Sequence, residues 1–325
     1  MFSDAEINDA AQRLAKSDNT HVVSLWAFPN EPSDYLSKKL CLVDSVNSFQ
    51  RDIMIPLAHA ILNRTAKGLT FSGLDNIPDS PTLFISNHRD IVLDAYFLQV
   101  ILLENNIETS QIIAGTNLFV NPFVTDIAYC NKLVPIGRGG SKRAFGEEMI
   151  HISEHLRNTL TSADGGASVW IAQRNGRTKD RKDKTDPSII HMLCTTGTID
   201  AYNIVPVTIT YEIEPNAVYK ALYLYQQDHP DATSEENYME QIIGSILQPK
   251  GHIHYSFHPR VDLTCHEVSH KEYYQLVAHR IDDAILSGYK HWEKNQDVEK
   301  QWENMLNSVP THVRPYLHTF DPIYE

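Results

Sequence analysis

His88, Asp90 and Asp94 are the residues of this sequence best suited to proton transfer, and they lie together in the stretch SNHRDIVLD at positions 86–94. An imidazole has an unperturbed pKa of about 6.5, so it can accept a proton at neutral pH. A carboxylate on the other ring nitrogen fixes the tautomer and stabilises the imidazolium. We therefore predict a general base, His88, with an aspartate as its partner.

Two aspartates compete for the partner role. Asp90 directly precedes an apolar run, where its side chain is suited to accept hydrogen bonds from backbone amides two or three residues on. Asp94 lies inside that run, where an unpaired carboxylate would be costly to bury. We favour Asp94 as the partner because its burial demands one, and we keep Asp90 as the alternative.

Two further stretches are suited to binding an anion. LVPIGRGGSKR, at 133–143, places Arg138 in a glycine-rich turn between a strand and a helix that begins at Ser141, where free backbone amides favour a phosphate. A second loop holds six cations in eleven residues of a chain whose formal net charge is -13, which favours an anionic partner. These cations are Arg174, Arg177, Lys179, Arg181, Lys182 and Lys184.

Within this second loop, Arg174 and Arg177 are the better candidates because they lie nearest the strand end. The outer members are expected to be solvated, with Asp180 and Asp183 as local partners.

The elements that must position these residues alternate between strands and helices. Short apolar runs predict strands at 82–86, 111–114, 132–136, 168–172, 204–210 and 253–257. The clearest helix is 141–161, and helices are expected between the other strands. This pattern predicts an α/β fold, a layered mixed sheet flanked by helices, with helical N- and C-terminal extensions.

The proposed division of the chain is a helical segment at 1–67, an α/β core at 68–265 and a helical extension at 266–325. Helices are expected at 5–15, 33–43 and 49–66 in the first segment, with Pro56 kinking or restarting the third. This third helix has an apolar stripe with basic ends, so it either packs on the core, which we favour, or lies on a membrane surface. In the extension, 268–306 is expected to be helical, with a break at Gly288.

Taken in order, these stretches resemble the glycerolipid acyltransferase family, which includes 1-acylglycerol-3-phosphate acyltransferases. SNHRDIVLD resembles the family's NHxxxxD motif with one extra residue between the histidine and the aspartate, and the resemblance extends over about residues 68–211. LVPIGR corresponds to the second block and maps its phosphate-binding arginine to Arg138. In the third block, normally EGTR, Asn175 replaces the glutamate, Gly176 matches, and Arg177 or Thr178 stands near the arginine's place. IVPV, at 204–207, is the fourth block.

This resemblance implies an enzyme of phospholipid biosynthesis that moves a fatty acyl group without a cofactor. The donor would be acyl-CoA or an acylated carrier protein, and the acceptor a hydroxyl of a glycerol phosphate or lysophospholipid. His88 would take the hydroxyl proton, while Asp94 orients the ring. The oxyanion would be met by backbone amides at the start of the helix after His88 or by a nearby cation. The acceptor would contact Arg138, Arg174, Asn175, Gly176 and Arg177.

Other classes of function remain open at this stage. A covalent acyl-enzyme would use Cys130 or Cys194. A metal-dependent hydrolase would use His88 and Asp90, or the face formed by His252, His254 and His258, but we predict no metal site. A third possibility is a non-catalytic protein of the same fold that binds lipid.

Composition narrows these classes. The 41 acidic against 28 basic residues argue against a nucleic-acid partner. The four cysteines are widely separated, which favours a reducing compartment. We expect no signal peptide and no transmembrane helix, and hence a cytoplasmic protein for which peripheral contact with a membrane stays open.

Overall fold

The central element is a mixed β-sheet, seen in a computed structural model that describes residues 2–119, 121–137, 142–162, 165–232, 237–265 and 268–322. The described strands form one sheet in the order β1-β7-β6-β2-β5-β3-β4. Strands β2 to β6 run parallel to one another, and β7 is antiparallel to β6 and parallel to the edge strand β1. The strands are β1 (Ala66–Ser72), β2 (Thr82–Ser86), β3 (Gln111–Gly115), β4 (Leu133–Ile136), β5 (Val169–Ala172), β6 (Asn203–Tyr211) and β7 (Gly251–Phe257).

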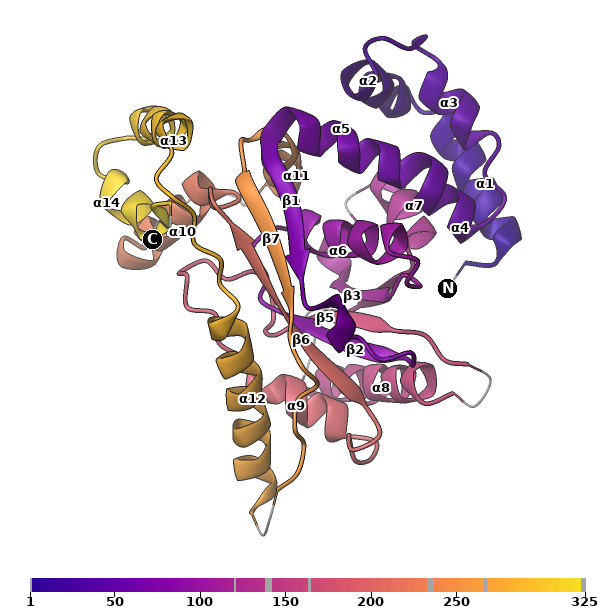
Figure 1. Cartoon of the computed structure of the whole chain (residues 1–325), viewed down its shortest axis with the longest axis vertical. Coiled ribbons are helices and arrows are strands. Elements are labelled where there is room, and N and C mark those ends of the chain that lie inside the picture. The colour runs from indigo at the N-terminus through magenta and orange to yellow at the C-terminus, as the bar shows by residue number, and fades with distance from the viewer. Residues whose placement is uncertain are drawn as a thin grey trace.

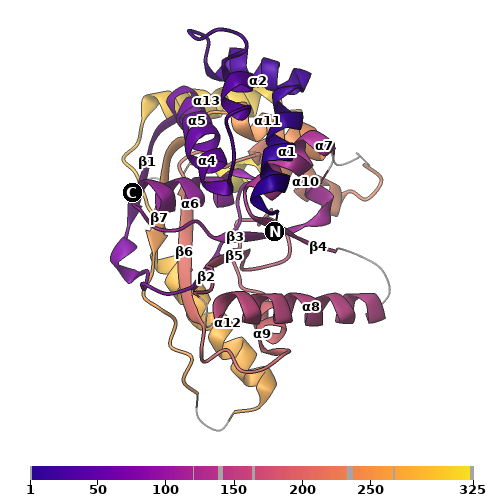
Figure 2. The ribbon, with the colours of Figure 1, turned by 90° about the vertical axis from the view of Figure 1, so that its right-hand side faces the viewer.

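Helices cover both faces of the sheet, as Figures 1 and 2 show. One face packs against α5 and α6, and the other against α8, α9 and α12. The α-helices are α1 (Asp4–Ala15), α2 (Asp18–Ala27), α3 (Tyr35–Leu40), α4 (Val46–Phe49), α5 (Ile55–Thr65), α6 (Leu93–Glu104), α7 (Pro122–Cys130), α8 (Lys142–Leu160), α9 (Pro187–Cys194), α10 (Ala217–Asp228), α11 (Tyr238–Leu247), α12 (His270–Ser287), α13 (Gln296–Ser308) and α14 (Arg314–Leu317).

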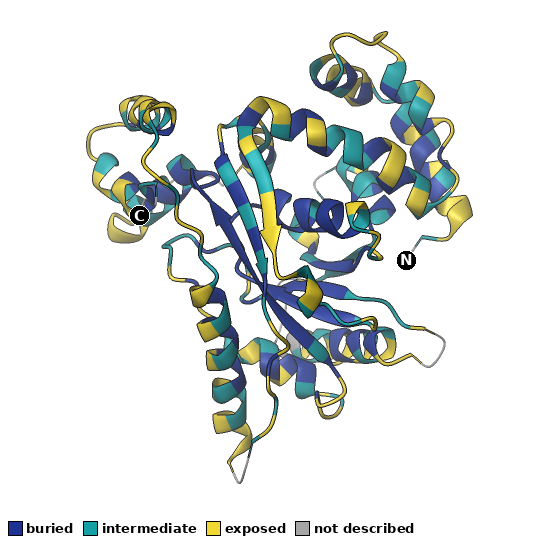
Figure 3. Cartoon of the chain, in the orientation of Figure 1, coloured by how far each residue is buried: buried dark blue, intermediate teal, exposed yellow. Residues whose placement is uncertain are grey.

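The central strands are buried on both faces, which explains their continuous apolar sequence. All five residues of β2 are buried, with Phe84 packed towards α6 and its neighbours Leu83 and Ile85 packed towards α8 and α12. Helix α6 is also apolar around most of its circumference, and it is largely buried. Figure 3 shows this buried centre, with the edge strand β1 more exposed.

Helical segments extend the core at both ends of the chain. Helices α1, α3 and α4 share a small apolar core with α7, and Arg13 of α1 forms an ion pair of 2.6 Å with Asp126 of α7. At the other end, α13 and α14 pack on α10. None of the helices in the described ranges has the length and apolar character needed to cross a bilayer.

The α/β class and the helical extensions are confirmed, and each predicted strand is present with ends that differ by at most two residues. Gly288 ends α12, as predicted. Pro56 stands in the first turn of α5, after a π-helical turn (Gln50–Met54), so it restarts the helix. Helix α5 buries Ala58 and Ile61 in the main core, as the favoured core-packing interpretation requires.

The N-terminal prediction was wrong in detail. Residues 33–43 contain a shorter helix, α3, and α2 was not predicted. Strand β1 begins at Ala66, where we expected the third helix to end. Within the described residues it pairs only with β7, and its last three residues are exposed, so its sequence lacks the apolar run of an internal strand. The division of the chain at residues 67 and 265 stays a prediction.

Lys250, directly before β7, is a buried cation with a testable effect on stability. Its Nζ donates to Thr65 Oγ1 at 2.9 Å and to the carbonyl oxygens of Ile246 and Gln248 at 3.0 and 2.8 Å. Burial lowers the pKa of Lys250 from 10.5 to about 8, and nearby Asp90 opposes this shift.

We therefore expect Lys250 to make folding stability depend on pH. Between pH 8 and 10.5 the unfolded chain holds a proton that the folded chain has lost, so the free energy of unfolding rises with pH by about 3 kcal/mol in total. Urea unfolding of the wild type and Lys250→Met at pH 7 to 10 measures this effect. The free energy of unfolding of the wild type, minus that of Lys250→Met, should rise with pH. A difference that stays constant across this range would contradict the depressed pKa.

Candidate functional site

The candidate site lies where parallel strands end at the same edge of the sheet. Strand β2 ends at Ser86, and α6 begins only at Leu93, so residues 87–92 form a non-helical loop. His88 Nδ1 lies 2.9 Å from Asp94 Oδ2, and the side chains are 14% and 0% exposed. The late start of α6 accommodates the extra residue between His88 and Asp94, because the loop brings the first turn of α6 back to the histidine.

Asp94 is held by several donors besides His88. Its Oδ2 accepts the backbone N–H groups of Arg89 and Asp90 at 2.6 and 2.8 Å, and its Oδ1 accepts the hydroxyl of Tyr211 at 2.9 Å. The hydroxyl of Tyr255 donates to the backbone carbonyl of Asp94 at 2.8 Å. Burial and the Asp94 carboxylate raise the pKa of Tyr211, so this phenol stays protonated and donates. These bonds fix the carboxylate that faces Nδ1, which leaves Nε2 of the imidazole for a reacting group.

Asp90 faces away from His88. Its Oδ1 accepts the backbone N–H groups of Val92 and Leu93 at 2.9 and 2.7 Å, and its Oδ2 accepts the hydroxyl of Ser245 in α11. The structure thus places Asp94 against the imidazole, whereas Asp90 fixes the turn before α6.

These bonds also bear on how an oxyanion could be stabilised. The backbone N–H groups of Arg89, Asp90, Val92 and Leu93 all donate to one or the other aspartate. These four N–H groups are therefore already engaged, which favours the other predicted partner of an oxyanion, a nearby cation.

The residues on either side of the imidazole are fixed by the neighbouring strands. Trp170 of β5 lies edge to face with His88 at 5.6 Å between ring centroids, and its Nε1 donates to Ser86 Oγ at 2.9 Å. The Asn87 side chain accepts from the backbone N–H of Ile209 at 2.8 Å and donates to its carbonyl at 2.9 Å. The amide of Asn87 thereby continues the pairing of β2 with β6.

A buried ion network anchors the residue after the histidine. The Arg89 guanidinium is 4% exposed and pairs with Asp183 and Glu214, while Lys220 pairs with Glu214 and donates to the Arg89 carbonyl at 2.7 Å. Burial acts to raise the pKa of Glu214, but Lys220 and Arg89 lower it below its ordinary value. Tyr289, just after α12, donates its hydroxyl to Asp183 and accepts from Arg89 at 2.9 Å. The loop of His88 is thus bonded to segments that precede α11 in the sequence and to one that follows it.

The loop after β5 meets the histidine loop directly. The backbone N–H of Thr178 donates to the carbonyl of His88 at 2.8 Å, and Arg177 Nη2 donates to Gln241 Oε1 of α11 at 2.6 Å. Gly176 adopts a φ of +80°, a conformation that favours glycine. The third sequence block therefore contacts the backbone of His88.

The other predicted anion-binding residues differ in exposure, and not all of them are described. Arg174 is partly exposed and Asn175 is exposed, at the start of the same loop. Arg138 and Ser141 lie outside the described residues.

Of the outer cations of this loop, Lys182 and Lys184 are exposed, as predicted, whereas Lys179 and Arg181 are partly buried, which corrects our prediction for these two. Lys179 Nζ lies 3.8 Å from the centre of the Tyr223 ring. Burial lowers the pKa of Arg181. Asp183 is buried and pairs with Arg89 instead of with a cation of its own loop.

The metal-dependent and the cysteine-based alternatives find less support in the structure. In the described ranges, no group of three or more histidine, cysteine, aspartate or glutamate side chains is arranged to hold a metal ion. The three histidines near β7 each bond to a different residue: His252 to Glu212, His254 to Thr70 and His258 to Thr208. Burial raises the pKa of Cys130 to about 12 and that of Cys194 to about 11, so both thiols are protonated and poor nucleophiles at neutral pH.

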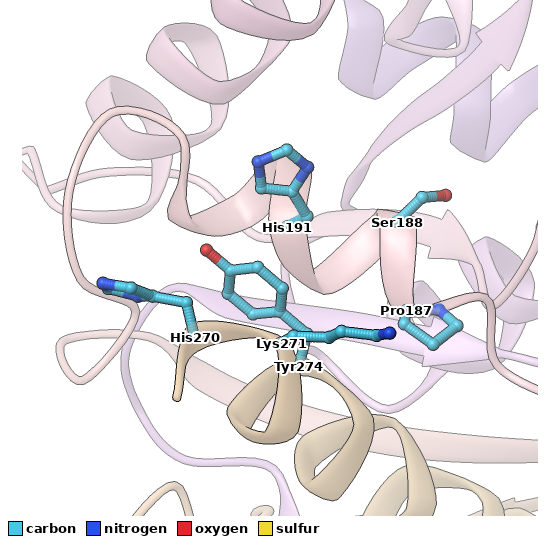
Figure 4. Close-up of a pocket in the computed structure, with 6 residues that line it drawn as sticks. All are labelled: Pro187, Ser188, His191, His270, Lys271 and Tyr274. Carbon is cyan, nitrogen blue, oxygen red and sulfur yellow. The ribbon is translucent and has the colours of Figure 1, made fainter. Parts of the chain in front are cut away.

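A surface cavity of about 550 Å³ lies between α9 and α12, away from the candidate residues. Figure 4 shows the Tyr274 ring between side chains of the two helices. The residues that line the cavity are Pro187, Ser188, His191, His270, Lys271 and Tyr274.

Several residues of the site were not predicted from the sequence: Arg89, Tyr211, Glu214, Lys220, Gln241, Ser245 and Tyr255. Arg89 lies inside the histidine motif, and Tyr211 and Glu214 end or follow a buried strand, where polar residues tend to mark a site. The sequence could therefore have indicated these three residues as members of the site.

The fold and this edge define an α/β protein with a histidine–carboxylate pair after a buried parallel strand. Residues 68–210 match the model of the acyltransferase family, and this part of the chain is an acyltransferase-family domain. Among solved structures, the 1-acyl-sn-glycerophosphate (LPA) acyltransferase PlsC from Thermotoga maritima aligns with 90% of this chain and 98% of that chain, at 15% identity and a TM-score of 0.44. No curated protein matches the chain.

Proposed function

We propose that this protein transfers a fatty acyl group from a thioester donor to a hydroxyl of a glycerol phosphate or lysophospholipid. The observation that carries the proposal is the hydrogen bond between His88 and buried Asp94 inside an acyltransferase-family domain. A ring held by a carboxylate at Nδ1 presents Nε2 as a general base.

The reaction needs one proton carrier and no acyl-enzyme intermediate. His88 Nε2 takes the proton of the acceptor hydroxyl as its oxygen bonds to the thioester carbonyl carbon. The tetrahedral intermediate then collapses, the C–S bond breaks, and the imidazolium returns the proton to the departing thiolate. Asp94 stabilises the imidazolium between these two transfers.

Acceptor recognition falls to the loop after β5. Arg177 and Arg174 supply positive charge from the loop that bonds to the backbone of His88, Asn175 and Gly176 lie between them in sequence, and Arg138 is a further proposed phosphate contact. With the amides after His88 occupied, a guanidinium from this loop is also the proposed partner of the oxyanion.

An assay with purified protein tests the proposal. Palmitoyl-CoA or an acylated carrier protein is offered with glycerol 3-phosphate, 1-acylglycerol 3-phosphate or a lyso-aminolipid, and both thiol release and acylated product are measured. We expect thiol release that depends on one acceptor and equals the acylated product. Thiol release without acylated product would indicate a thioesterase. Binding of an acceptor without turnover with any donor would indicate a non-catalytic lipid-binding protein.

A further inference from the structure

Helix α11 contacts loops on both sides of the candidate site, although it lies outside the segment that matches the family model. Ser245 bonds to Asp90 in the loop after β2, and Gln241 bonds to Arg177 in the loop after β5. One rigid element therefore touches the loop of the proposed base and the loop of the proposed anion-binding cation.

The contact of Ser245 reaches the proton-transfer pair through one residue. Ser245 is fully buried, and its hydroxyl donates to Oδ2 of Asp90, whose backbone N–H donates to Asp94 Oδ2 at 2.8 Å. Asp94 Oδ2 is the oxygen that faces His88 Nδ1. A shift of Asp90 therefore moves a donor of the carboxylate that orients the imidazole.

The contact of Gln241 fixes the direction of a cation. Gln241 is 4% exposed, and its Oε1 accepts one N–H of the Arg177 guanidinium at 2.6 Å. Because a guanidinium is a planar fork of donors, a bond on one edge sets where its other edges point. Gln241 thus orients the group proposed to bind the acceptor.

The helix itself is firmly attached. Lys250 donates to the carbonyl oxygens of Ile246 and Gln248 at its C-terminal end, and the side chain of Gln248 bonds to the backbone of Asn216 and Glu214. These bonds fix α11 to β7 and to the segment after β6. Its outer face exposes Ile243, which offers a control position on the same helix.

We propose that α11 sets the position of His88 relative to Arg177, with Ser245 as a positioning residue for proton transfer and Gln241 as a positioning residue for an anionic acceptor. This inference rests on the proposed acyl transfer. It predicts that the two residues affect different kinetic constants, which a merely structural helix would not produce.

At position 241 the test compares two substitutions. Gln241→Leu removes the acceptor of the Arg177 bond, and we expect the KM for glycerol 3-phosphate or its acylated form to rise about tenfold with little change in kcat. Gln241→Glu places a carboxylate on the guanidinium, which strengthens that contact but competes with the substrate's phosphate. We expect Gln241→Glu to keep or raise the melting temperature while KM still rises. An unchanged KM in Gln241→Glu would overturn the role of Gln241.

At position 245 the expected effect is on turnover. Ser245→Ala should lower kcat about three- to tenfold and leave KM for the acceptor within about twofold, because the hydroxyl acts on the proton-transfer loop. Ser245→Thr keeps the hydroxyl and should recover part of kcat. Ile243→Ala should match the wild type in both constants. Equal changes of kcat and KM at positions 241 and 245, in step with melting temperature, would reduce α11 to a structural support.

A readout without turnover separates this inference from the proposed function. If the wild type transfers no acyl group, the proposed function fails, and calorimetric binding of glycerol 3-phosphate still tests α11. Weaker binding in Gln241→Leu and Gln241→Glu, with normal binding in Ser245→Ala and Ile243→Ala, supports the inference. Equal binding in all four variants overturns it.

Discussion

Replacing His88 with alanine is expected to lower kcat for acyl transfer by about 10²- to 10⁴-fold, the usual contribution of a general base. The imidazole is the group proposed to take the acceptor's proton, and its Nδ1 is already held by Asp94. Three other donors remain on Asp94 after the substitution, so the fold should persist. Steady-state transfer with the best acceptor, together with a thermal melt, measures both effects.

His191→Ala is the matched control for this variant. His191 lines the cavity between α9 and α12, so its removal should leave transfer unchanged. A His88→Ala protein that is folded and turns over at the wild-type rate would exclude His88 as the base.

Asp94→Asn is expected to reduce both turnover and stability. The carboxylate accepts from His88, from two backbone amides and from Tyr211, whereas an asparagine amide has one acceptor oxygen and directs an NH₂ group at some of these donors. We expect kcat to fall about 100-fold or more because the imidazolium loses its counter-charge. The free energy of unfolding should fall by about 1–3 kcal/mol, the cost of buried donors left without an acceptor.

Tyr211→Phe should have a smaller effect than Asp94→Asn, because it removes one donor but keeps the charge of Asp94. Its kcat should lie between those of the wild type and Asp94→Asn, as measured in parallel assays and urea unfolding. Full turnover in Asp94→Asn would mean that the carboxylate is not the functional partner of His88.

The contact between His88 and Asp94 could be predicted from the sequence because its evidence is local. An aspartate inside an apolar run is costly to bury without a partner, and the histidine at the preceding strand end was the nearest suitable one. The spacing of six positions could not be judged from the sequence, since it depends on where α6 begins, and that start is set by the bonds of Asp90 to Val92 and Leu93.

The residues that hold the site in place could not be predicted, because their partners are far away in the sequence. Arg89 pairs with Asp183 and Glu214, which are 94 and 125 positions away, and Ser245 reaches Asp90 across 155 positions. Such long-range pairs follow from the folded sheet order, in which β6 lies beside β2 although the strands β3, β4 and β5 come between them in the sequence. Strand β1 was missed because an exposed edge strand lacks a continuous apolar run.

The ion network around Arg89 bears on whether the domain can stand alone. A fragment ending at residue 210 would keep Arg89, Asp90 and Asp183 but lose Glu214, Lys220 and Ser245. The loop after β2 would then carry Arg89 without one of its two carboxylate partners, at a cost that commonly reaches several kcal/mol for a broken buried pair. Such a fragment should regain its native loop only on mixing with the missing C-terminal piece, so the folding unit that builds this loop is longer than the segment that matches the family model.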